Sequence, residues 1–288
     1  MAGRGIDFEH RFNTSRWAED LLLNSLNAQD NFLAVRFGLS RVRAAKDVVY
    51  DKAGWKEPDL LVYDAKALTA QERKWLDGRD LSIEARESFE KGGENNFAIS
   101  KAAAAIEVEF SPYRASEMKG RTWIPKTPAQ WERRPLKNAN PPTAPNIWVK
   151  EEDLGRLNAW QAAFEVPILI AHLFDQEAFA VALEKVSTFN DKFETQGTNP
   201  IELQMTTGIF KKEQSYDRQD AQGAGEHKTV FVITPGVAVR VGEVKKVQVK
   251  AQLGVSASKK YVTHSIFSGG EISFTPEFLQ MLLSARQH

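Results

Sequence analysis

The sequence has no cysteine among its 288 residues, and its formal net charge is zero. The absence of thiols excludes disulfides, zinc-thiolate sites and cysteine nucleophiles, and it fits a reducing compartment. We find no N-terminal apolar segment of the secretory kind and no apolar run of membrane-spanning length. We therefore expect a cytoplasmic protein that makes no contact with a membrane.

Several catalytic motifs are also missing. The chain contains no nucleophile elbow, no Walker loop and no histidine cluster with zinc spacing, so other hydrolase and kinase functions have little support. The Gly223-Ala224-Gly225 stretch has no strand-to-helix context and is interpreted as a loop. The apolar fraction of 42% is typical of a globular protein with a substantial core.

Charge is balanced overall but unevenly distributed. Residues 203–264 contain ten Lys/Arg against five Asp/Glu, and residues 111–134 contain six against two. A basic face that binds nucleic acid is therefore compatible with neutrality. The alternative is that these lysines and arginines only solvate the surface.

Acidic residues follow a strand pattern at residues 105–110. Ile106 and Val108 alternate with Glu107 and Glu109, and a period of two sends the carboxylates to one face of the strand. Such alternation is also typical of an ordinary solvated sheet face, and this interpretation of Glu107 and Glu109 remains an alternative.

A second acidic position opens another apolar run. Asp59 follows Pro58 and precedes Leu60, and proline is tolerated where a strand begins. If the two strands are neighbours, Asp59 and Glu107 face each other. Magnesium takes oxygen ligands, keeps several waters and usually binds through one or two carboxylates, so this pair predicts a Mg²⁺ site.

The order of elements along the chain is read from periodicity. We expect a helix at residues 13–28, strands at 31–39, 59–63 and 105–110, a helix from residue 151, and a buried strand at 166–174. A further helix is expected at 176–189, then short strands at 203–210, 229–233, 237–241, 244–253 and 261–267. Thr275 is expected to cap a last helix. His172, in the buried strand, is interpreted as a core histidine.

These acidic residues resemble the signature of the PD-(D/E)xK nuclease superfamily. Pro58-Asp59 matches its first part, and Glu107-Val108-Glu109 matches the variant in which glutamate replaces the lysine. The resemblance implies an α+β fold with an αβββαβ core and a central mixed sheet. The expected order of elements agrees with that core.

The resemblance also implies roles for the residues that match it. Asp59, Glu107 and the carbonyl of Val108 would bind Mg²⁺, and Glu109 would orient or deprotonate the attacking water or ligate a second metal. A glutamate of the first helix would turn toward the metal, which points to Glu19. A first-turn acid favoured by the helix dipole is the alternative for Glu19.

The implied function is hydrolysis of double-stranded DNA at a specific sequence by a homodimer, leaving 5′-phosphate ends. Lys119 could also replace the missing motif lysine, although a solvated helix face explains it as well. The candidate DNA contacts are basic residues in the two basic stretches: Arg114, Lys119, Arg121, Arg133, Arg134, Lys211, Lys212, Arg218 and Arg240. Two alternatives remain, namely a structure-specific repair or recombination nuclease and a non-catalytic DNA-binding protein.

The expected organisation has two parts. Residues 1–195 form the catalytic core, with a helical insertion at 68–92 and a proline-rich segment at 124–146 that is either a DNA-contacting arm or a connector. Residues 196–288 form a basic, β-rich extension packed on the core.

Overall fold

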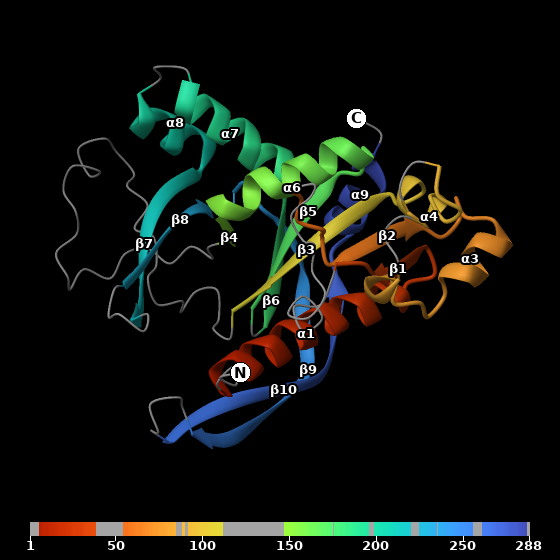
Figure 1. Ribbon diagram of the computed structural model, residues 1–288, viewed down its shortest axis with the longest axis horizontal. Helices are drawn as coiled ribbons and strands as arrows, with labels where there is room; N and C mark the ends of the chain where they lie inside the picture. Colours follow the sequence, from red (N-terminus) through yellow and green to blue (C-terminus); the bar gives the residue numbers. More distant parts are fainter. Residues whose placement is uncertain are drawn as a thin grey trace.

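The computed structural model describes residues 6–38, 54–84, 88–89, 92–111, 147–174, 176–195, 199–219, 225–234, 236–255 and 261–286. These residues form a mixed α/β structure around a large curled sheet (Figure 1). None of the helices in these ranges is both long enough and apolar enough to cross a membrane.

The main sheet has seven strands in the order β1-β2-β3-β5-β6-β9-β10. They are β1 (Phe32–Arg36), β2 (Leu60–Asp64), β3 (Ala104–Phe110), β5 (Ile168–Leu173), β6 (Glu177–Ala182), β9 (Val239–Val255) and β10 (Tyr261–Phe274). The β3 and β5 strands are parallel, and every other neighbouring pair is antiparallel. The parallel pair requires a crossover, which α6 (Glu151–Phe164) provides.

Helices cover both faces of this sheet. One face packs against α1 (Ile6–Asn27) and α9 (Pro276–Ser284), where Leu22 and Phe278 are fully buried. The other face packs against α6 and α7 (Leu183–Thr195), where Trp160 is fully buried. Successive residues of β2 therefore enter different cores, Leu60 on the α1 side and Leu61 on the α6 side. Coverage of both faces explains why β2 and β5 read as nearly continuous apolar runs.

A smaller antiparallel sheet has the order β4-β8-β7. It consists of β4 (Ile147–Lys150), β8 (Gly225–Ile233) and β7 (Ile209–Gln219), and it lies beside α6, α7 and α8 (Pro200–Thr207). Short helices fill the region between β2 and β3: α3 (Ala70–Leu76), the 3₁₀ turn η1 (Leu81–Ile83) and α4 (Phe97–Ser100). These lie in and just after the expected insertion.

Two expected elements are wrong. Residues 176–189 were expected as one helix, but β6 occupies Glu177–Ala182 and α7 begins at Leu183. Residues 203–210 were expected as a strand, but α8 runs through Thr207. The first error arises because pairing between β5 and β9 overrides the helix preference of an alanine-rich segment. The separate strands expected at 237–241 and 244–253 are one long strand, β9.

Sheet pairing crosses the boundary expected near residue 195. The β9 and β10 strands extend the main sheet from β6, and β7 and β8 pair with β4, which lies before that boundary. The β9-β10 hairpin continues past α1 as a long projection (Figure 1). The C-terminal third is therefore built into both sheets.

Candidate active site

The candidate site lies where β2 begins beside β3. Leu60 pairs with Ile106 in the antiparallel ladder, so Asp59 lies next to Glu107 at the following position. The Asp59 carboxylate accepts a hydrogen bond of 2.7 Å from the backbone N–H of Val108. The pair predicted from sequence is therefore brought together, with Asp59 held at the backbone of β3.

Glu107 points to the α6 side of the sheet, into a mostly apolar setting. Its side chain is only 7% exposed, and its Oε1 lies 2.6 Å from Nζ of Lys56. Its Oε2 is buried, and no hydrogen-bond donor among the described residues reaches it. A buried carboxylate oxygen without a donor is unfavourable, so this atom indicates a site that accommodates a further ligand.

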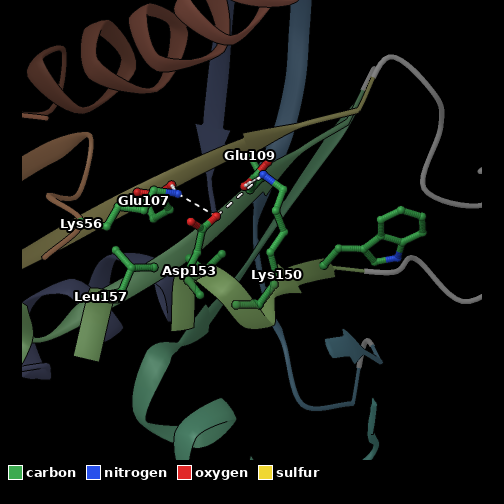
Figure 2. Close-up of a pocket in the computed structure, with 9 residues that line it drawn as sticks. Lys56, Glu107, Glu109, Lys150, Asp153 and Leu157 are labelled. Carbon is green, nitrogen blue, oxygen red and sulfur yellow. Dashed lines mark ion pairs between the residues drawn. The ribbon is translucent and has the colours of Figure 1, made fainter. Parts of the chain in front are cut away.

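Lys56 and the start of α6 complete a network of alternating charges (Figure 2). Lys56 Nζ also lies 2.9 Å from Oδ2 of Asp153, and Lys150 Nζ lies 3.7 Å from both Asp153 and Glu109. The order of contacts is thus Glu107, Lys56, Asp153, Lys150 and Glu109. Together with Asp59, four carboxylates surround two ammonium groups, which leaves a formal charge of two negative.

Local packing fixes both lysines. The backbone N–H of Lys56 donates to the carbonyl of Arg156 in α6 at 3.2 Å, and the Arg156 guanidinium donates back to the carbonyl of Trp55. The Trp55 ring packs edge-to-face against Phe164 at the other end of that helix. Lys150 is the N-cap of α6, and Asp153 lies in its first turn, where the helix dipole favours an acid.

These side chains enclose a cavity of about 10 Å³ lined by Lys56, Glu107, Glu109, Lys150 and Asp153, together with neighbouring apolar groups. A space of about 10–15 Å³ holds one water molecule. The cavity therefore has room for a single water-sized group beside Glu107, and Asp59 does not line it.

Burial changes the acidity of these groups. It raises the pKa of Glu107 to about 8, with a further contribution from the Asp59 carboxylate and opposition from Lys56. Burial likewise raises the pKa of Asp59 to about 7, with Glu19 adding to the effect, while the N–H of Val108 and Lys56 oppose it. For Lys56, burial alone would lower the pKa, but Glu107, Asp153 and Glu109 raise it above its ordinary value. The ammonium group therefore stays charged.

Glu19 approaches the site from the opposite face of the sheet. It lies on α1 and forms an ion pair with Arg36 of β1, which also binds Asp20. Burial raises the pKa of Glu19, and Arg36 and Arg16 oppose the rise. Glu19 is close enough to raise the pKa of Asp59, so the structure places it beside the predicted pair. Its carboxylate is nevertheless engaged by an arginine.

The candidate DNA contacts divide into three groups. Five of them, Arg114, Lys119, Arg121, Arg133 and Arg134, lie outside the described residues, as does the proline-rich segment. The side chains of Lys212 and Arg218, on β7, are also outside the described set. Lys211 forms ion pairs with Glu151 and Glu194, so its charge is neutralised within the chain. Arg240 is exposed on β9.

Sequence reasoning missed the roles of Lys56, Lys150 and Asp153. Lys56 lies two residues before Pro58, and the spacing of Lys150 and Asp153 is that of neighbours on one helical turn. These two features were visible in the sequence. They could not predict that the first turn of α6 lies over β3.

His172 is buried, as expected of a core histidine. Its Nε2 lies 2.8 Å from Oγ of Ser111, its ring stacks on Phe174, and burial lowers its pKa to about 4. It neighbours Glu109 across the parallel β3-β5 ladder. The imidazole is therefore neutral near pH 7.

Comparisons with protein-family models, with curated protein sequences and with solved structures gave no match to this chain. Within the described residues, no three His, Asp or Glu side chains are grouped as a ready-made metal cage. The expected magnesium ligands are two carboxylates and one carbonyl, and Mg²⁺ is commonly held by so few protein groups because it keeps its waters.

Proposed function

We propose that this protein is a Mg²⁺-dependent DNA endonuclease of the PD-(D/E)xK type. The observation that carries the proposal is the position of the Asp59 carboxylate on the backbone of β3, beside Glu107. Asp59, Glu107 and Glu109 are the residues that the motif resemblance selects, and the pairing of β2 with β3 brings the first two next to each other. The element order from α1 through β3 and α6 to β5 agrees with the implied αβββαβ core.

The residues present fit a divalent cation. Glu107 has a buried oxygen without a donor, and the cluster contains four carboxyl groups against two ammonium groups. Hard oxygen donors of this kind suit magnesium. Asp59, Glu107 and the carbonyl of Val108 would hold it. When bound, Mg²⁺ would acidify a water molecule and stabilise charge on the phosphoryl oxygens.

The remaining chemistry falls to side chains around the ligands. Glu109 is about one-third exposed and lies two residues beyond Glu107 on the same strand, so it can reach a water at the edge of the site. It would orient this water and accept its proton. Lys150, beside Glu109, would attract the phosphate.

The proposed substrate is double-stranded DNA cut at a specific sequence, with 5′-phosphate ends. A homodimer would cut both strands of a palindromic site, because a two-fold axis in the protein matches that of the DNA. The β9-β10 hairpin carries exposed Lys250, which we propose as a contact to the DNA backbone. Its neighbours Lys245 and Lys246 are also exposed, but they form ion pairs with Glu243 and Glu271.

Plasmid cleavage with and without Mg²⁺ tests the proposal. Asp59→Asn and Glu107→Gln should each lower cleavage at least about 100-fold, since each removes a carboxylate assigned to hold the metal ion that acts on the water and the phosphate. Asp64→Asn is the matched control, because it changes the other end of β2. Full activity in both site variants would refute the assignment.

The form of the products distinguishes the proposal from its alternatives. Discrete bands with uniform 5′-phosphate ends are expected for a sequence-specific enzyme. A smear, or cleavage confined to flaps and junctions, would indicate a structure-specific nuclease instead. DNA binding without cleavage in any divalent cation would indicate a non-catalytic DNA-binding protein.

A further inference from the structure

The ammonium group of Lys56 lies beside Glu107, where a metal ion bound by that carboxylate would otherwise lie. Its ammonium group lies 2.6 Å from Glu107, one of the two carboxylates assigned to the metal. A fixed positive charge at this distance repels a divalent cation strongly, because the protein interior screens it less than water does. Although the cavity has room for a water-sized group, a divalent cation bound by Glu107 therefore requires Lys56 to shift or to share that carboxylate.

Asp153 offers Lys56 a second position. Its Oδ2 lies 2.9 Å from the same ammonium group, on the side away from β3. Lys56 therefore already contacts both carboxylates, and a small rotation of its flexible side chain would exchange a shared contact for one with Asp153 alone. The backbone of Lys56 need not move, since the N–H donates to the carbonyl of Arg156 on the same helix as Asp153.

We propose that Lys56 is an internal counter-cation that holds Glu107 in the metal-free protein and withdraws to Asp153 when a divalent cation binds. The proposal rests on the proposed function, because it takes Glu107 as a metal ligand. Three observations support it: the two short ion pairs of Lys56, the donor-free buried Oε2 of Glu107, and the cavity of about 10 Å³ that Lys56, Glu107 and Asp153 help to line.

The two partners of Lys56 should influence metal affinity in opposite directions. Lys56→Met removes the competing charge and should tighten Mg²⁺ binding at least about tenfold. Asp153→Asn removes the alternative position and should weaken binding by about threefold to tenfold. In the Lys56→Met background, Asp153→Asn should have a smaller effect, since the two residues act through one contact.

The experiment is titration calorimetry of the full chain with Mg²⁺, without DNA and at alkaline pH, where the acids are ionised. Lys101→Met is the control for Lys56→Met, because Lys101 pairs with an acid, Glu72, on an exposed surface. Glu152→Gln is the control for Asp153→Asn, since it lies in the same first turn of α6. Thermal melting identifies any variant that fails to fold, and Asp153→Asn then still decides the question.

The outcomes separate the two proposals. Tighter binding in Lys56→Met together with weaker binding in Asp153→Asn would support the counter-cation. Unchanged or weaker binding in a folded Lys56→Met, or unchanged binding in Asp153→Asn, would overturn it and leave the nuclease proposal standing. Absence of Mg²⁺ binding in the wild-type protein would instead contradict the metal site itself.

Discussion

The metal-free protein should lose stability as the pH rises from neutral to alkaline values. Asp59 and Glu107 have pKa values of about 7 and about 8 in the folded chain, whereas an unfolded chain would have ordinary values near 4. Between these limits the folded state binds more protons than the unfolded state, so the free energy of unfolding falls with pH. The loss should be complete above about pH 9.

The size of the effect follows from burial. A carboxyl group whose pKa moves from 3.8 to about 7 accounts for about 4 kcal/mol between its two protonation states. The two acids share Lys56 and influence each other, so their effects do not add. Most of this change falls below pH 6.5, where the acids are already ionised in the unfolded chain but still protonated in the folded one. Between about pH 6.5 and pH 9 we therefore expect a loss of about 1–3 kcal/mol in unfolding free energy. Starting near pH 6.5 limits the contribution of His172 to about 0.4 kcal/mol, because its ordinary pKa in the unfolded chain is 6.5.

Urea unfolding at several pH values measures this slope, with EDTA present to exclude metals. Glu107→Gln resembles the protonated acid in shape, so it should flatten the slope and be more stable than wild type near pH 9. Glu109→Gln makes the same change two residues along β3 at a more exposed side chain. It should flatten the slope much less than Glu107→Gln, because Glu109 is only a minor cause of the raised pKa values of Asp59 and Glu107. An equal slope in wild type and Glu107→Gln, or a wild-type stability that rises with pH, would refute this reasoning.

Three other predictions concern the supporting structure. Arg36→Met should lower the unfolding free energy by about 3–5 kcal/mol, because it leaves the partly buried Glu19 without its cation, and urea unfolding checks this. In the wild type, His172 takes up a proton in the unfolded chain below about pH 6.5 but stays neutral in the folded chain down to about pH 4, so acid lowers the unfolding free energy. His172→Leu lacks this effect and should gain stability relative to wild type over this range, which melting curves would show. Thr275→Ala should lower the unfolding free energy by about 1 kcal/mol, because its hydroxyl caps α9 by accepting from the N–H of Phe278, whereas Thr275→Ser should be nearly neutral in the same unfolding assay.

The sequence predicted the strands around the site well because their patterns are local. Alternation marked β3, the continuous apolar run marked β5, and the threonine cap marked α9. The failures occurred where tertiary pairing decided the outcome. Residues Glu177–Ala182 have the composition of a helix but form the strand between β5 and β9. Pro200 was the missed signal for α8, since proline favours the first turn of a helix.

The same division holds within the site. Asp59, Glu107 and Glu109 could be selected because a motif and two strand patterns identify them. Lys56 and Asp153 could not, because their contact depends on how the segment before β2 docks against α6, 97 positions further along the chain by the numbering. Long-range contacts of this kind leave no periodic trace in either segment.

The balance of charges gives the strongest physical reason to regard this cluster as a functional site. Leucine or glutamine in place of Glu107 would satisfy packing without a buried charge, and replacement of buried ion pairs by neutral groups is often neutral or stabilising. The cluster instead keeps two acids with raised pKa values, one of them with a donor-free oxygen. Unfavourable burial of ionisable groups is typical of sites where a ligand supplies the missing interaction. A variant that becomes more stable at alkaline pH while losing Mg²⁺ binding would therefore link the two properties through one side chain.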